Sequence, residues 1–240
     1  MLWQIDASKK MVNVLNKVLL IDDVVIGGSV ESPAELDIYS DVDIKIILLD
    51  NTRINIKNVL DAIATEFAPV FGFEVISHTR KDAIRVCLEN GMRFDLIIRY
   101  PNDKEPMSED DTFSQKVDGV VNQFWFLASM ILVKLGRRDN LIAAHLSLEL
   151  YQLVIVVQML VRDNAKDTNI HRFGDSEKIP SLHTLSCIAA PFSLNCDTAD
   201  KVLAMLFSVA SEKENELARL NFGYSKKSDV LESMALQLLT

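Results

Sequence analysis

Two closely spaced carboxylates that follow a glycine-rich turn constrain this chain more than any other feature of its sequence. Residues 24–49 read VVIGGSVESPAELDIYSDVDIKIILL, which predicts a strand, a Gly-Gly-Ser turn and a second strand. Side chains alternate between the two faces of a strand, so Asp41 and Asp43 are expected on the same face. The other face of this strand carries the apolar residues Val42, Ile44 and Ile46. The second strand therefore offers one face to a hydrophobic core and one face to charge.

The spacing of these groups suits phosphate and divalent-ion chemistry. Carboxylates at positions i and i+2 of a strand have Cα atoms roughly 6.5–7 Å apart, close enough to bind one or two Mg²⁺ ions together. Gly27 and Gly28 leave backbone N–H groups uncovered for a phosphate, and Ser29 adds a hydroxyl donor. The turn matches neither G-x-x-x-x-G-K-[ST] nor G-x-G-x-x-G, which disfavours a P-loop ATPase and a dinucleotide-binding fold.

A third carboxylate, Asp95, lies on the last strand of the first half of the chain. The apolar face of that strand is formed by Met92, Phe94, Leu96 and Ile98. Asp95 therefore belongs to the opposite face, where a charge among hydrophobic neighbours needs a partner. If this strand pairs beside the strand of Asp41 and Asp43, the three carboxylates meet next to the glycine turn. Such an arrangement is typical of two-metal sites that promote attack on phosphorus.

The order of these parts resembles one enzyme superfamily. Gly27-Gly28-Ser29, eleven intervening residues, Asp41-x-Asp43 and a later Asp95 look like the motif of the polymerase-β-like nucleotidyltransferases. Among its branches the chain is most similar to the enzymes that modify aminoglycoside or lincosamide antibiotics. Weaker similarity in the second half lies at residues 122–125, 134–141 and 169–174.

The resemblance implies a role for each matched residue. Asp41, Asp43 and Asp95 would be the catalytic residues and the ligands of two Mg²⁺ ions, with Asp95 either a metal ligand or a general base. The nucleotide, ATP or another nucleoside triphosphate, would be bound by Gly27, Gly28, Ser29 and Lys134. For Lys134 a solvated lysine near a helix C-terminus is an equally good interpretation.

Hydrophobic periodicity predicts an α/β (α+β) domain with a mixed sheet, followed by an all-α helical bundle. Strands are expected at residues 24–26, 42–49, 73–77, 83–89 and 92–100, and helices at residues 10–21 and 54–67. Asn90-Gly91 favours a type I′ turn between the last two strands. Further helices are expected at residues 116–135, 140–161, 182–190, 198–218 and 226–239. The polar segment 101–112 looks like a linker, which gives a catalytic domain of residues 1–112 and a helical substrate-binding domain of residues 113–240.

Composition excludes several other classes of protein. A net charge of −9 argues against a basic nucleic-acid-binding surface. The apolar runs near residues 44–49 and 153–161 are shorter than the roughly 20 residues of a bilayer span, and the N-terminus does not look like a secretory signal. The three cysteines, Cys87, Cys187 and Cys196, form no C-x-x-C pair, so we expect reduced thiols in a cytoplasmic protein without structural zinc.

The sequence therefore predicts an enzyme that transfers a nucleoside monophosphate, AMP in the first instance, to a hydroxyl of a small molecule and releases pyrophosphate. The acceptor, for which a cationic antibiotic is a candidate, is expected to bind between the two halves. Two alternatives stay open, namely AMP transfer onto a protein partner and a non-catalytic nucleotide-binding module. Trp125 could stack on a ligand, although packing in the core is favoured. His171 and Arg172 fit a phosphate contact or a surface loop equally well, and the oligomeric state is open.

Overall fold

The computed structural model describes residues 2–32, 34, 36–103, 113–166, 199, 202–204, 206–211, 214 and 226–239. The chain divides into two compact units, Met1–Asp110 and Asp111–Thr240. Each unit has its own hydrophobic core.

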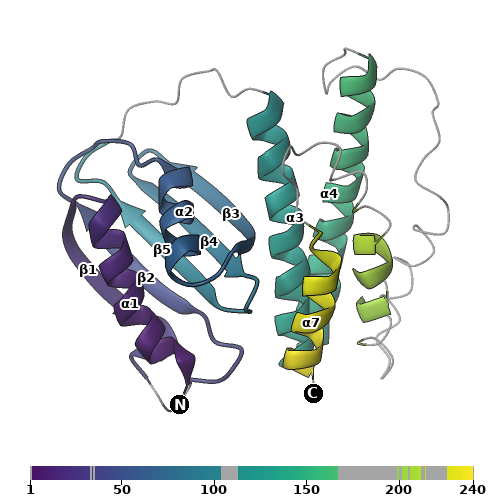
Figure 1. Ribbon diagram of the computed structural model, residues 1–240, viewed down its shortest axis with the longest axis horizontal. Helices are drawn as coiled ribbons and strands as arrows, with labels where there is room; N and C mark the ends of the chain where they lie inside the picture. The colour runs from purple at the N-terminus through teal and green to yellow at the C-terminus, as the bar shows by residue number, and fades with distance from the viewer. Residues whose placement is uncertain are drawn as a thin grey trace. The chain divides into compact units, whose positions relative to one another are not determined.

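The first unit is built on a five-stranded mixed sheet (Figure 1). The strands are β1 (Ile21–Gly27), β2 (Val42–Leu48), β3 (Val70–His78), β4 (Lys81–Leu88) and β5 (Arg93–Arg99), arranged in the order β1-β2-β5-β4-β3. β2 and β5 are parallel, and the other three neighbouring pairs are antiparallel. The predicted mixed sheet is thus confirmed, and β2 lies directly beside the strand that carries Asp95.

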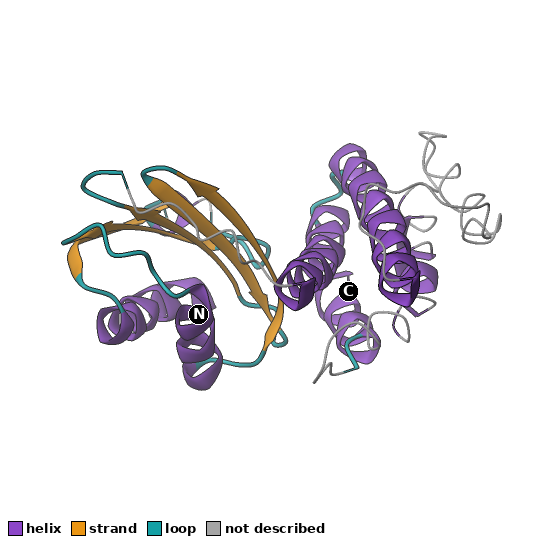
Figure 2. Ribbon diagram, turned by 90° about the horizontal axis from the view of Figure 1, so that it is seen from above, coloured by secondary structure: helices purple, strands orange, loops and turns teal. Residues whose placement is uncertain are grey.

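Both helices of this unit, α1 (Trp3–Val18) and α2 (Ile56–Glu66), cover the same face of the sheet (Figure 2). The core between helices and sheet contains alternate residues of the central strands, among them Ile44, Ile46, Phe94 and Leu96. The intervening residues of these strands belong to the opposite face, which neither α1 nor α2 covers. The alternation read from the sequence therefore separates an apolar core face from a charged open face.

α1 differs from the prediction at both ends. The helix begins at Trp3, because its first turns pack through Gln4, Ala7 and Ser8, which a hydrophobic pattern does not detect. It ends at Val18, and the following residue, Leu19, has an extended backbone that leads into β1. The prediction of helix over residues 10–21 was therefore right in type and wrong in bounds.

The hairpin between β4 and β5 is confirmed, but its turn is not type I′. Only Gly91 has a positive φ, +80°, whereas a type I′ turn needs a second positive φ at Asn90. The N–H of Gly91 donates to the carbonyl of Leu88 at 2.9 Å, and the N–H of Leu88 donates to the carbonyl of Met92 at the same distance. Three residues therefore connect the strands, and this loop length decides which side chains of β4 face those of β5.

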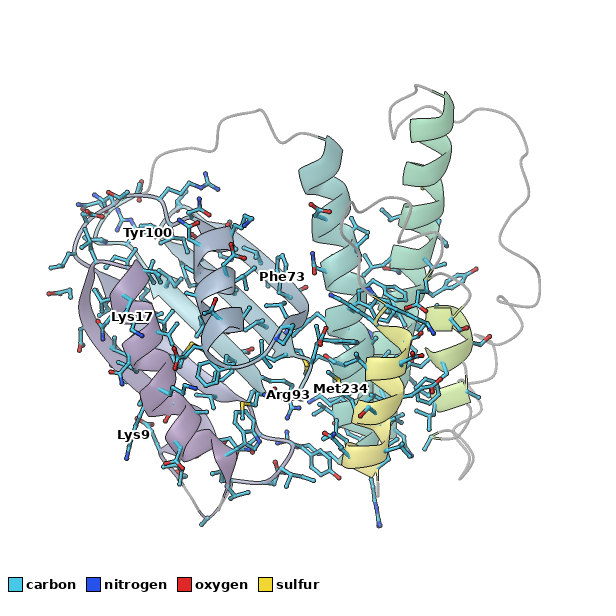
Figure 3. The ribbon with its side chains drawn as sticks, in the orientation of Figure 1. Lys9, Lys17, Phe73, Arg93, Tyr100 and Met234 are labelled. Carbon is cyan, nitrogen blue, oxygen red and sulfur yellow. The ribbon has the colours of Figure 1, made fainter. Side chains whose placement is uncertain are left out.

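The two ends of β5 are held differently (Figure 3). Arg93, at the start of the strand, is buried and donates from Nη1 to the carbonyl of Gly91 at 2.9 Å. Tyr100, just beyond the other end, donates its hydroxyl to the buried Asp82 at 2.6 Å, and burial raises the pKa of that hydroxyl further above its ordinary value. Asp95 lies near the Arg93 end.

Every regular element described in the second unit is a helix. α3 (Phe113–Gly136) packs against α4 (Asn140–Lys166) and α7 (Ser228–Leu239), and further helical residues lie between 199 and 214. The predicted bundle is confirmed for this part of the chain. Phe124, Trp125 and Phe126 are buried, which supports their interpretation as core residues. The predicted helix at residues 182–190, together with His171, Arg172, Cys187 and Cys196, lies outside the described residues, whereas Cys87 is buried.

One stretch of α3, Asp118–Gly136, is long and apolar enough to cross a bilayer by length and composition alone. Asn122, Gln123 and Lys134 interrupt its apolar run, so a search for continuous apolar residues does not detect it. Its most apolar window is 61% buried within the protein, which is also typical of the core helix of a bundle.

Candidate active site

One row of residues crosses the open face of the sheet from edge to edge. Strand pairing places Gly27 opposite Asp43, Asp43 opposite Asp95, Asp95 opposite Arg85, and Arg85 opposite Glu74. Each of the five strands contributes one member of this row. The structure thus brings the predicted residues Asp43 and Asp95 to the same register position of two parallel neighbouring strands.

Such a pair is unfavourable in an ordinary sheet. Side chains directly opposite each other on neighbouring strands lie close together, and like charges at such positions are destabilising. Both carboxylates are only half-buried on the open face, so a ligand that approaches this face can reach them. The arrangement is therefore better explained by the binding of a cation or an electrophile than by stability.

Asp41 lies just before β2, and a hydrogen-bonded turn fixes the chain that leads to it. The side-chain amide of the buried Gln4 donates to the carbonyls of Asp37 at 2.7 Å and Ser40 at 3.1 Å. The hydroxyl of Ser40 and the backbone N–H of Tyr39 both donate to Oδ1 of Asp37, at 2.8 and 2.9 Å. Gln4 was not predicted from the sequence, since a polar residue in a helix gives no signal of what it contacts.

The glycine turn packs directly against one of the carboxylates. Gly28 has φ of +66°, and a Cβ at this position would lie 2.0 Å from Oδ2 and 3.0 Å from Cγ of Asp43. A side chain there would therefore displace the carboxylate as well as strain the backbone. Gly28 opens a single turn of 3-10 helix, Gly28–Val30, which contains the half-buried Ser29. Approach of a phosphate to Gly27, Gly28 and Ser29 stays a prediction.

Electrostatics raise the pKa of two carboxyl groups in the row. Burial is the main cause for Asp95, and the negative charges of Asp41 and Asp43 add to it, so that its pKa rises to about 6 although Arg85 opposes the shift. Burial and the charge of Asp41 likewise raise the pKa of Asp43, again against the effect of Arg85. The three carboxylates are thus close enough to act on one another.

Arg85 is the residue of the row that the sequence analysis missed. Its Nε donates to Oδ2 of Asp95 at 3.1 Å and lies 3.4 Å from Oδ1, while its Nη1 lies 3.4 Å from Oε2 of Glu74. One guanidinium therefore bridges a carboxylate on each neighbouring strand. The register of the β4–β5 hairpin would have predicted its place opposite Asp95, but this register depends on the length of the turn.

The carboxylates of the site could supply some, but not all, of the ligands of a Mg²⁺ ion. Among the described residues, no three ligating side chains converge on one point where a metal ion could be held. Mg²⁺ is usually bound by one or two carboxylates together with water and substrate phosphates, and seldom by an all-protein cage. Asp43, seated against Gly28, and the neighbouring Asp41 supply such a partial set. The residues thus fit an ion that arrives with a nucleoside triphosphate.

Lys134 and two of the histidines, His78 and His145, are not members of this row. Lys134 is half-buried in the last turn of α3, in the second unit, and its contact with a triphosphate stays a prediction. His78 is exposed at the end of β3. His145 lies 3.4 Å from Glu149 on the same helix.

No family model matches the chain, and no curated protein matches it. Among solved structures, the chain is similar to an aminoglycoside 6-adenyltransferase from Bacillus subtilis, with 12% identity, coverage of 99% of both chains and a TM-score of 0.40.

The chain is also similar to two cyclic dinucleotide enzymes. One is a STING-associated CdnE c-di-GMP synthase from Capnocytophaga granulosa, with 15% identity, 98% and 78% of the two chains covered and a TM-score of 0.29. The other is a CdnE cyclic dinucleotide synthase from Elizabethkingia meningoseptica with GTP and Apcpp, with 14% identity, 97% and 89% covered and a TM-score of 0.24. All three TM-scores lie below 0.5, so these similarities carry no weight for the function of this chain.

The contact between Gly28 and Asp43 can be tested with a matched pair of variants. Gly28→Ala and Gly91→Ala both place a side chain at a positive φ, but a Cβ at Gly91 meets nothing within 4 Å. Each variant should lose about 1 kcal/mol of unfolding free energy from backbone strain. Gly28→Ala should lose more, because Asp43 has to move. Equal losses of stability in denaturant titrations of the two variants would contradict this contact.

The raised pKa of Asp95 predicts how the stability of the metal-free protein depends on pH. The folded protein holds the proton more tightly than the unfolded chain, so the unfolding free energy should fall as the pH rises from about 4 to above 6. In Asp95→Asn the unfolding free energy should decrease less between these pH values. The difference from the wild type should be no more than about 3 kcal/mol, at about 1.4 kcal/mol per pKa unit. Urea titrations in EDTA at pH 4.5 and 7.5 measure it. Parallel pH profiles of wild type and variant would show that Asp95 does not titrate as stated.

Proposed function

We propose that the protein is a magnesium-dependent nucleotidyltransferase that moves a nucleoside monophosphate, AMP in the first instance, from a nucleoside triphosphate to a hydroxyl of a small molecule. The observation that supports this most is the row in which Asp43 and Asp95 lie side by side on parallel strands, with Gly28 against Asp43. Paired carboxylates beside a glycine turn suit a substrate that brings both a divalent cation and phosphates.

The chain's own residues divide the work. Asp41 and Asp43 would hold Mg²⁺, which neutralises the phosphates and polarises the α-phosphoryl group when bound. Backbone N–H groups of Gly27 and Gly28 and the hydroxyl of Ser29 would orient the triphosphate. The acceptor oxygen forms a bond to the α-phosphorus, the bond from that phosphorus to the α,β-bridging oxygen breaks, and pyrophosphate leaves.

Asp95 suits the role of general base for the acceptor hydroxyl. A base is most effective when its pKa lies near the working pH, and the pKa of Asp95 is raised to about 6. The group is then mostly ionised at pH 7 and still basic enough to accept a proton. Service as an additional metal ligand is the competing role.

We further propose that residues 1–112 form the catalytic domain and residues 113–240 the helical substrate-binding domain, with Lys134 as a contact of the triphosphate. Aminoglycosides and lincosamides are the acceptors to test first, which would make the protein a cytoplasmic antibiotic-resistance enzyme. A net charge of −9 suits a cationic acceptor.

The direct test incubates the purified protein with Mg²⁺, each of four nucleoside triphosphates and a panel of aminoglycosides and lincosamides. Pyrophosphate release and an acceptor mass increased by one nucleoside monophosphate are expected for at least one combination. Label transferred to a protein instead would support AMP transfer onto a partner. Nucleotide binding without any pyrophosphate release would support a non-catalytic module.

Replacement of either metal-binding carboxylate should abolish transfer. Asp41→Ala and Asp43→Ala remove ligands from the open face, so the unfolding free energy should change by less than about 1 kcal/mol. Asp23→Ala is the matched control, because Asp23 is exposed on the same face and is paired with Ile47, away from the row. Near wild-type turnover of either ligand variant at saturating Mg²⁺ would show that the assignment is wrong.

Asp95→Asn distinguishes the two roles of this residue. As the general base, Asp95 cannot be replaced by an amide, so turnover should fall on the order of 100-fold or more while nucleotide affinity is preserved. The wild type should also lose turnover below about pH 6, where the base becomes protonated. A variant with weakened nucleotide affinity and a rate restored by high Mg²⁺ would identify Asp95 as a metal ligand.

A further inference from the structure

Arg85 connects the acidic row to the far edge of the sheet. Its two hydrogen-bonding ends point to different strands, with Nε 3.1 Å from Oδ2 of Asp95 on β5 and Nη1 3.4 Å from Oε2 of Glu74 on β3. A planar guanidinium held at both ends has few alternative conformations. The carboxylate of Asp95 is therefore held from the side that lies away from Asp43.

These three side chains are partly shielded from solvent. The exposed fractions are 33% for Arg85, 24% for Asp95 and 19% for Glu74. An ion pair of two partly buried carboxylates around one arginine is not a flexible surface contact, since loss of its cation leaves two negative charges with reduced hydration. Arg85, Asp95 and Glu74 therefore form a fixed group of side chains.

The charge of Arg85 also acts on the rest of the site. It favours the ionised form of Asp43 as well as that of Asp95, and its own pKa is raised by the charges of Asp95, Glu74 and Asp41. Strand pairing opposite Asp95 places this cation beside the carboxylates. A cation at this position repels an incoming metal ion, so its charge alone weakens metal binding.

We infer that Arg85, anchored by Glu74, is a positioning residue that holds the carboxylate of Asp95 beside Asp43 for the metal-bound nucleotide. This inference rests on the proposed function with Asp95 in its competing role, that of an additional metal ligand. It assigns Arg85 and Glu74 a task in the reaction although neither touches the substrate.

A positioning role and a mere charge-balancing role predict opposite effects on metal binding. If Arg85 only balances charge, its removal makes the site more negative, and a divalent cation binds more tightly. If Arg85 positions Asp95, its removal leaves that carboxylate free to turn away from Asp43, and the cation binds more weakly. The sign of the change therefore separates the two roles.

The experiment measures binding of a non-reacting nucleotide with and without metal. The four α,β-methylene nucleoside triphosphates, which lack the bond that transfer would break, are titrated in Mn²⁺ and in EDTA, and the tightest one is used. The ratio of its dissociation constants in EDTA and in Mn²⁺ reports metal binding without turnover. The variants are Arg85→Met, Arg85→Lys and Glu74→Gln.

Arg99→Met is the matched control, because Arg99 is exposed on the same face of β5 and is paired with Ile47 and Lys81 rather than with the acidic row. It should leave the ratio unchanged. Arg85→Met should lower the ratio about 10- to 100-fold, the usual effect of losing a residue that orients a metal ligand. Arg85→Lys keeps the charge but has one nitrogen for two carboxylates, so it should recover only part of the ratio. Glu74→Gln should lower it less than Arg85→Met.

Turnover at saturating nucleotide and metal should follow the same order, with the KM of the acceptor unchanged. An unchanged or increased ratio in folded Arg85→Met overturns the inference. If that variant does not fold, a wild-type ratio in Arg85→Lys overturns it, since the charge is retained there. A wild type that shows the metal-dependent ratio but transfers no nucleotide refutes the proposed function, while the comparison of variants still decides the role of Arg85.

Discussion

The parallel pairing of β2 with β5 brings two carboxylates, those of Asp43 and Asp95, to one register position. The two negative charges repel each other, and the rest of the site is arranged around this repulsion. Asp43 and Asp95 lie side by side with raised pKa values, so the empty site costs stability. Gly28 gives the first carboxylate room, and Arg85 holds the second from β4. The apolar residues on the other face, buried under α1 and α2, supply the free energy that offsets this cost.

Alternation with a period of two made most of this face predictable. In β2 and β5 every second residue is buried, so the sequence assigns Asp43 and Asp95 to the face opposite the core without any knowledge of the fold. The start of α1 was not predictable in this way. Gln4 and Ser8 are buried polar residues there, and hydropathy gives no reason to place them in a core. The hydrogen bonds of Gln4 to the turn before Asp41 are likewise a purely tertiary feature.

The pairing of Arg85 with Asp95 escaped prediction because of one turn. A two-residue type I′ turn at Asn90-Gly91 would place Val86 opposite Asp95, whereas the observed three-residue connection places Arg85 there. A shift of one residue exchanges the two faces of a strand, so the turn decides whether Asp95 has a cationic neighbour. Whether Asn90 adopts a positive φ depends on the strands that it connects as well as on its own preference.

The order of the strands also bears on how the site forms during folding. β1 and β2 are neighbours in sequence and in the sheet, and β3, β4 and β5 form a separate antiparallel meander. Asp43 belongs to the first of these local pieces, and Asp95, Arg85 and Glu74 belong to the second. The long-range docking of β2 on β5 closes the largest loop in the sheet, so it is the slowest pairing to form by chance. The meander can join Arg85 to Asp95 and Glu74 beforehand, which gives Asp95 a counter-charge before Asp43 arrives.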